Sequence, residues 1–145
     1  MSVTRNDPLT IFLGGERTQI NVYAAAAAIK PGMLVELDDV SGTVRWKVAT
    51  ADIDGPPAFA TEMAMMNKGV DDAYAAADLM EVSIGAKGSW FWGRMQSGQT
   101  VAAGDLMCSA GGGYLKIGAT VARFYADETK TAAFTGDTMI RVTVK

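Results

Sequence analysis

From residue 33 to the C-terminus, the sequence consists of short apolar runs that are interrupted by glycine, aspartate and proline. The last run, Met139 to Val144, alternates apolar and polar residues almost throughout. Alternation is typical of a half-buried β-strand, because successive side chains point to opposite faces. No long segment repeats its apolar residues with the period of a helix. The sequence therefore predicts a mainly β fold, either a compact β-sandwich of jelly-roll type or a small β-barrel.

Two apolar runs flank the dipeptide Ser41-Gly42, and together they predict a β-hairpin. The first run covers residues 33–37, and the second, Val44 to Val48, alternates apolar and basic side chains. Further strands are predicted over residues 81–84, 89–92 and 114–117.

Two segments are less regular. The alanines at 24–28 favour a helix by propensity, but Pro31-Gly32 follows so closely that we expect an extended or single-turn lead into the next strand. Residues 59–66 are apolar and rich in methionine, and they fit either a strand or a loop.

A short pattern also recurs along the chain. Ala75 to Met80 and Ala102 to Met107 differ at one position, and Ile29 to Val35 is a looser copy. The spacings between the copies are unequal, which excludes a solenoid. The pattern predicts a recurrent tight turn that leads into a strand.

The length of 145 residues is that of one domain. We divide it into an extended N-terminal arm, residues 1–18, and a single β domain, residues 19–145. The arm either packs onto the body or adds a strand to a neighbouring molecule, and the sequence leaves both open. Its apolar residues are the candidate contacts, and they are Leu9, Ile11, Phe12 and Leu13.

Composition excludes several classes of function. The formal charge is −3, with 13 basic and 16 acidic residues and no basic cluster, which argues against a nucleic-acid partner. There is no histidine, so imidazole zinc sites, Ser-His-Asp triads and histidine bases are excluded. The single cysteine, Cys108, has no partner for a disulfide and is expected to be a small buried apolar residue. No apolar run is long enough to span a membrane, and the polar N-terminus predicts a protein made in the cytoplasm.

The motifs that could carry chemistry lack the neighbouring residues or the geometry that this chemistry needs. Gly111-Gly112-Gly113 lacks the Lys-Ser or Lys-Thr of a phosphate-binding loop, and a strand pattern follows it. The pairs Asp38-Asp39 and Asp71-Asp72 place neighbouring carboxylates on opposite faces of any strand. Asp52 to Gly55 lacks the downstream glutamate of a calcium loop. We therefore expect no catalytic, cofactor-binding or metal-binding residues, and no enzyme.

The densest feature is the aromatic run Trp90-Phe91-Trp92. In a strand, the two tryptophans share one face and Phe91 takes the other. These residues are expected in the core or at a subunit interface, and an exposed tryptophan would also suit a carbohydrate platform. The chain has 9 methionines, and three lie close together in a part expected to be core or contact surface: Met63, Met65 and Met66.

Several short motifs resemble those of a known family. They are Ile29-Lys30-Pro31-Gly32-Met33-Leu34-Val35, Val48-Ala49, Gly55 with Ala58, and Gly104-Asp105-Leu106 with Gly113 downstream. Together they look like small phage capsid decoration proteins, also called cement proteins, over residues 19–145. The segment from Gly85 to Asp105 fits the later part of that family's pattern approximately.

The resemblance implies a protein of the capsid exterior without catalytic residues. Its partners would be the major capsid protein and other copies of itself, as a homodimer or homotrimer, with no nucleic acid and no membrane. It would clamp neighbouring coat subunits and stabilise the mature shell. Two other classes stay open: a carbohydrate-binding module of a virion, and a lipoyl-type carrier, for which Gly104-Asp105-Leu106 fits but the modifiable lysine motif is missing.

Overall fold

The computed structural model describes residues 10–53, 55–63, 69–119, 121–132 and 138–145. These residues form β-strands and no helix, which confirms the mainly β prediction. The strands are β1 (Phe12–Gly14), β2 (Arg17–Ile20), β3 (Val35–Val40), β4 (Thr43–Val48), β5 (Ala58–Thr61), β6 (Glu81–Gly85), β7 (Trp90–Arg94), β8 (Thr100–Val101), β9 (Leu106–Gly111), β10 (Tyr114–Ile117), β11 (Phe124–Ala126), β12 (Lys130–Thr131) and β13 (Met139–Val144).

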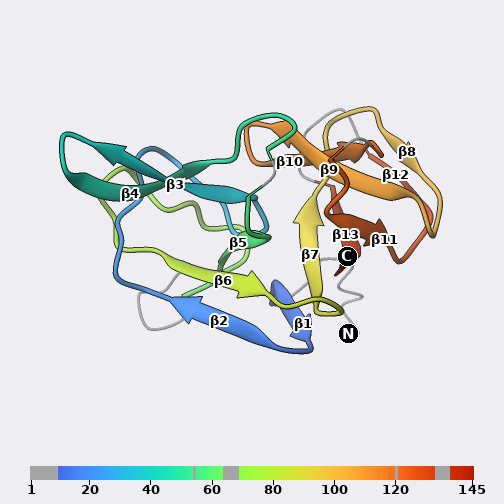
Figure 1. Cartoon of the computed structure of the whole chain (residues 1–145), viewed down its shortest axis with the longest axis horizontal. Helices are drawn as coiled ribbons and strands as arrows, with labels where there is room; N and C mark the ends of the chain where they lie inside the picture. Colours follow the sequence, from blue (N-terminus) through green and yellow to red (C-terminus); the bar gives the residue numbers. More distant parts are fainter. Residues whose placement is uncertain (1–9, 54, 64–68, 120, 133–137) are drawn as a thin grey trace, which may run out of the picture.

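The strands form antiparallel sheets in a sandwich-like arrangement that does not close into a barrel. A six-stranded sheet has the order β1-β7-β13-β11-β9-β10, and a three-stranded sheet has the order β2-β6-β5. The pairs β3-β4 and β8-β12 complete the fold. In Figure 1 the six-stranded sheet fills the right half of the molecule, and the β3-β4 hairpin projects at the upper left.

Two apolar clusters fill the interior. The first lies against the six-stranded sheet and contains packed phenylalanines: the rings of Phe59 and Phe91 stack 4.7 Å apart, and those of Phe59 and Phe124 are tilted and 5.3 Å apart. The second lies between the β3-β4 hairpin and the three-stranded sheet, around Trp46 and Tyr74. The Tyr74 hydroxyl donates to the carbonyl of Thr61 at 2.6 Å, and burial raises its pKa to about 12.

The predicted hairpin is present. Strands β3 and β4 pair in register from Val35↔Val48 to Val40↔Thr43. Ser41 and Gly42 both have positive φ, 54° and 83°, which is the backbone of the two-residue turn that matches strand twist. The alanines at 24–28 are extended, with isolated bridges and no helix, as expected.

The repeated pattern is a repeated turn. The amide of Ala75 donates to the Asp78 carboxylate at 2.8 Å, and that of Ala102 donates to the Asp105 carboxylate at 2.9 Å. The third residue of each turn has positive φ, 92° at Gly104 but 71° at Ala77. The turns are thus the same, except that one places an L-residue where glycine is favoured.

This difference predicts opposite effects of two substitutions. A left-handed backbone costs an L-residue about 1–2 kcal/mol, and glycine loses about 0.5–1 kcal/mol through the unfolded chain. Ala77→Gly should therefore raise the free energy of unfolding by about 0.5–1 kcal/mol. Gly104→Ala should lower it by about 1 kcal/mol, although no heavy atom lies within 4 Å of the added methyl group. Urea denaturation of both variants measures this, and a loss of stability in Ala77→Gly would contradict it.

Candidate functional site: the Trp90 face

The outer face of the six-stranded sheet carries the largest exposed aromatic side chain of the described residues. Trp90 on β7 is 52% exposed. Beside it lie an exposed leucine of β1, a polar pair of β13 and an exposed tyrosine of β11. We call this surface the Trp90 face, and its residues are Leu13, Trp90, Tyr125, Asp127, Arg141 and Thr143.

Strand alternation places these side chains on one side of the sheet. Trp90 pairs with Thr143, and Thr143 pairs with Tyr125 on the next strand, so the three form one row across the sheet. Their neighbours Phe91, Val142 and Phe124 are buried in the first apolar cluster. The sheet therefore has an inner face that forms the core and an outer face that is open to solvent.

The two tryptophans of the aromatic run share a face, as predicted, but differ in their surroundings. Trp92 is half-buried and packs against the first apolar cluster. The ammonium of Lys130 lies 5.3 Å from the centre of its ring, and the same ammonium donates to the carbonyl of Met139 at 2.5 Å. Trp92 is thus covered in part by Lys130, whereas the ring of Trp90 is open to solvent.

Polar groups surround the exposed ring. Thr143 Oγ1 lies 2.8 and 2.7 Å from the two carboxylate oxygens of Asp127, to which it donates. The main chain of Arg141 is anchored, because its amide donates to Glu128 and its carbonyl accepts from Asp127. Among the described residues, the guanidinium of Arg141 has no ion pair or hydrogen bond. The face thus joins an aromatic surface to an open cationic donor.

The predicted arm contacts that the structure describes differ in how deeply they are buried. Ile11 is fully buried in the first apolar cluster, and its carbonyl accepts from the amide of Trp92 at 2.8 Å. The ring of Phe12 is half-buried, 5.3 Å from that of Phe91. Leu13 is 36% exposed and lies on the Trp90 face. Leu9 lies outside the described residues.

This placement changes the arm hypothesis for one residue. Ile11 fills this protein's own core, so in this conformation its side chain is not open to a coat subunit. Its amide is also anchored, donating to the Glu62 carboxylate at 3.0 Å. Deletion of residues 2–13 would remove part of the core, and the arm should instead be tested by deletion of residues 2–9. Leu13 is the described arm residue that remains a candidate contact.

The predicted methionine group is only partly described. Met63 is 8% exposed and belongs to the second apolar cluster, so it serves as core. Met65 and Met66 lie outside the described residues.

Cys108 is buried, and its thiol donates to the Asp52 carboxylate at 3.6 Å. Burial raises the pKa of this thiol, and the hydrogen bond to Asp52 acts in the same direction. A protonated buried thiol is a weak nucleophile. Within the described ranges, no group of three or more acidic or cysteine side chains is arranged to hold a metal ion.

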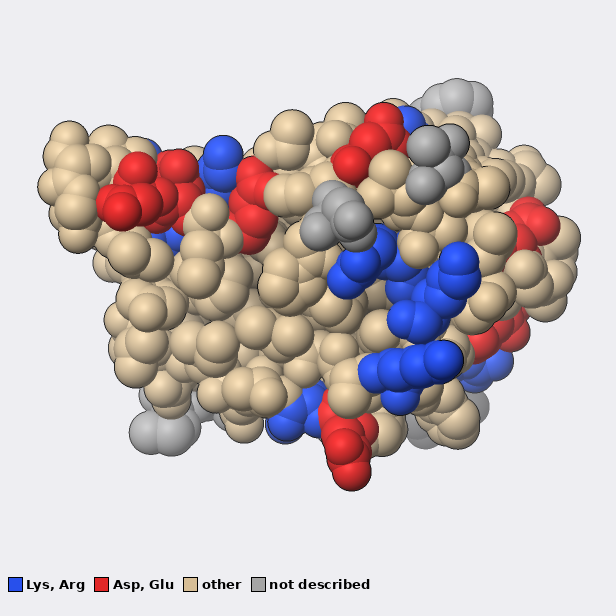
Figure 2. All heavy atoms as spheres, viewed as in Figure 1, with Lys and Arg blue, Asp and Glu red and all other residues tan. Residues whose placement is uncertain are grey.

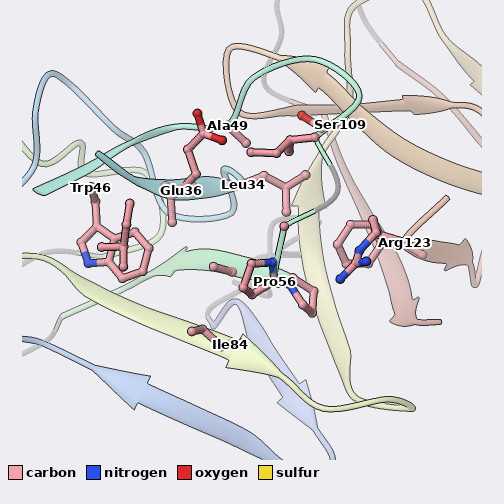
Figure 3. Close-up of a pocket in the computed structure, with 15 residues that line it drawn as sticks. Leu34, Glu36, Trp46, Ala49, Pro56, Ile84, Ser109 and Arg123 are labelled. Atoms are coloured by element: carbon pink, nitrogen blue, oxygen red, sulfur yellow. The ribbon is translucent and has the colours of Figure 1, made fainter. Parts of the chain in front are cut away.

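A second feature is an apolar pocket of about 310 Å³ between the β3-β4 hairpin, the β5-β6 strands and the start of β11. Figure 3 shows it with Trp46 on one side, Arg123 on the other, and Leu34 and Pro56 between them. Its walls include Val35 and Leu37 of β3 and Ile84 of β6. No sequence pattern marks this pocket, because its walls come from segments far apart in the chain.

Other residues of the Trp90 face were also missed. The alternation of residues 139–144 could have placed Arg141 and Thr143 on one face, because that strand was predicted. Tyr125 lies on β11, which has only three residues and therefore no pattern to find. No described helix is long and apolar enough to cross a membrane.

The site and fold together define an all-β domain with one aromatic sheet face open to solvent. No family model matches the chain, and no curated protein matches its sequence. Among solved structures, the fold is similar to the crystal structure of the N base of head fiber gp8.5 in bacteriophage phi29. The TM-score is 0.61 with 11% sequence identity, covering 90% of this chain and 95% of that chain. The likeness establishes a shared fold over nearly the whole length of both chains.

Proposed function

We propose that this chain is a non-enzymatic structural protein of a bacteriophage head, bound to the outside of the capsid. The observation that carries the proposal is the shared fold with the N base of a phage head fiber over 90% of the chain. The motifs that resemble capsid decoration proteins point to the same location. In this proposal the protein binds the major capsid protein, forms a homodimer or homotrimer, and stabilises the mature shell.

The Trp90 face is the surface proposed to contact the coat. Exposed tryptophan, tyrosine and arginine are the residue types that dominate protein interfaces, and Trp90, Tyr125 and Arg141 supply all three. Leu13 adds apolar area beside them. Weak contacts repeated over a symmetric shell then combine to give tight attachment.

The test is co-sedimentation of the purified protein with mature and immature heads of its source phage. Saturable binding to mature heads is expected for the unaltered protein. Trp90→Ala should weaken binding about thirty-fold or more, because truncating a central aromatic anchor costs about 2 kcal/mol or more. Leu79→Ala is the matched control, since Leu79 is 42% exposed and does not line the Trp90 face. It should bind as the unaltered protein does.

Two results would contradict parts of this proposal. If no variant binds heads of either form, the structural role is wrong. If Trp90→Ala binds normally, the role stands but the contact surface lies elsewhere. A version lacking residues 2–9 then tests the arm, which would be the attachment element if only that version failed to sediment.

A second candidate function is carbohydrate binding, and the exposure of Trp90 favours it. Sugar rings stack on exposed tryptophan, and a nearby carboxylate and guanidinium can bind hydroxyl groups. Asp127 and Arg141 occupy such positions beside Trp90. Titration of host surface glycans should then quench tryptophan fluorescence in the unaltered protein but not in Trp90→Phe. Absence of quenching would exclude this candidate.

A further inference from the structure

We propose that the free edge of β3, together with the apolar pocket beside it, binds an extended peptide segment of a partner protein. The segment would add a strand to the β3-β4 hairpin and place a bulky apolar side chain in the pocket. Acidic and basic residues would flank that side chain. This site is separate from the Trp90 face and does not depend on the proposed function.

The hairpin register turns one row of main-chain groups on β3 away from β4. In an antiparallel pair, residues opposite each other alternate between hydrogen-bonded and non-bonded pairs. The two-residue turn makes Val40↔Thr43 a bonded pair, so the main-chain groups of Leu37 and Asp39 point away from β4. No hydrogen bond of these groups occurs in the described part of the chain. The opposite edge of the hairpin, on β4, is occupied, because the amide of Trp46 donates to the carbonyl of Ala24 at 2.9 Å.

The pocket borders this free edge. Leu34, Val35, Glu36 and Leu37 all line it, although neighbouring side chains of a strand point to opposite faces. A cavity against one face alone would contact every second residue. The pocket also touches Trp46 of β4, so it extends from the inner face of the hairpin to the exposed Leu37 of β3.

Two apolar side chains of β3 are also exposed. Leu37 is 51% exposed and Val40 is 45% exposed. An exposed apolar edge strand promotes association, and proteins normally protect such edges with charge, proline or a covering segment. The pocket of about 310 Å³ beside Leu37 has room for a leucine-sized side chain. These features together match recognition by strand addition, in which main-chain bonds give affinity and a pocket gives specificity.

For an antiparallel segment, the charges at the two ends of the site set the order of its charged residues. Asp39 shares a face with Leu37, is exposed, and lies at the hairpin end. Arg123 lines the opposite end of the pocket. Figure 2 shows acidic side chains over the hairpin at the upper left and basic side chains gathered right of centre. An antiparallel segment would thus carry a basic residue, then an apolar residue, then an acidic residue, each two positions apart.

The experiment is a titration of the ¹⁵N-labelled protein with a capped peptide, Lys-Thr-Leu-Thr-Glu, followed by NMR. The amide signals of Leu37 and Asp39 should shift, with a Kd on the order of 1 mM for so short a segment. The charge-reversed peptide Glu-Thr-Leu-Thr-Lys should bind about three-fold more weakly. The peptide with glycine in place of leucine should bind about ten-fold more weakly or worse.

Three variants test the geometry. Leu37→Pro removes the outward amide and should abolish the shifts, while Leu37→Thr keeps that amide and should retain weak binding. Asp39→Lys should reverse the preference between the two charged peptides, and it decides the question if Leu37→Pro does not fold. The proposal is overturned if the amide signals of Leu37 and Asp39 do not move, if both charged peptides bind equally, or if the shifts fall on the Trp90 face. Trp90→Ala should bind the peptide normally, which separates this result from the outcome with phage heads.

Discussion

Replacing Arg94 by alanine is expected to lower the free energy of unfolding by about 3–5 kcal/mol. Arg94 is 1% exposed, yet its guanidinium is well satisfied. Its Nε donates to the carbonyl of Pro31 at 2.8 Å, and one terminal nitrogen donates to the carbonyl of Val70 at 2.9 Å. The same nitrogen lies 3.7 Å from the carboxylate of Asp71. Loss of this side chain would leave the two buried carbonyls without their hydrogen-bond donors. It would also open a cavity beneath two loops.

Thermal and urea denaturation measure this effect, and two further variants resolve its cause. Arg94→Met fills most of the cavity but supplies no donor, so it should recover part of the lost stability and remain below the unaltered protein. Arg141→Ala removes an exposed guanidinium and should change stability by less than about 0.5 kcal/mol. Unaltered stability in Arg94→Met would show that the hydrogen bonds to the two carbonyls contribute nothing.

Neighbouring residues of β7 should separate stability from binding. Phe91 is fully buried between Phe12 and Phe59, and Phe91→Ala should lower the free energy of unfolding by about 3–5 kcal/mol. Trp90→Ala, one position earlier, removes a larger but half-exposed side chain and should cost less than about 1 kcal/mol. Denaturation of the two variants side by side is the measurement. Equal losses would mean that Trp90 also supports the fold and that its binding data cannot be interpreted alone.

The longer strands were predictable from the sequence because their patterns are local. Alternation identified the strand at residues 139–144, because it depends only on the pleat. Ser41-Gly42 identified the hairpin, because that dipeptide fits the geometry of its turn. Strands β8 and β12 have two residues each and exist only because they pair with each other. No local pattern marks such elements, so their prediction needs the fold itself.

The candidate site, too, was predictable only where its pattern is local in the sequence. Alternation correctly placed Trp90 and Trp92 on one face, because both lie in a single strand. It could not show that Lys130, which lies far along the chain, covers Trp92 and leaves Trp90 open. Ile11 was assigned to an external contact because an apolar residue near a terminus has no sequence feature that distinguishes a core residue from an anchor. The peptide pocket escaped prediction for a related reason, since its walls come from several segments that meet only in the fold, around residues 34–37, 55–58 and 123–124.

The position of β13 also has a consequence for folding. The last strand, Met139–Val144, lies inside the six-stranded sheet, between β7 and β11, and pairs with both. During synthesis, β1, β7 and β11 leave the ribosome before the strand that joins them. The apolar side chains that will form the first cluster stay without their central layer until residue 144 has emerged, and such exposed surface promotes aggregation. We therefore expect this half of the domain to fold only after β13 has been made, and its apolar surfaces to need protection until then.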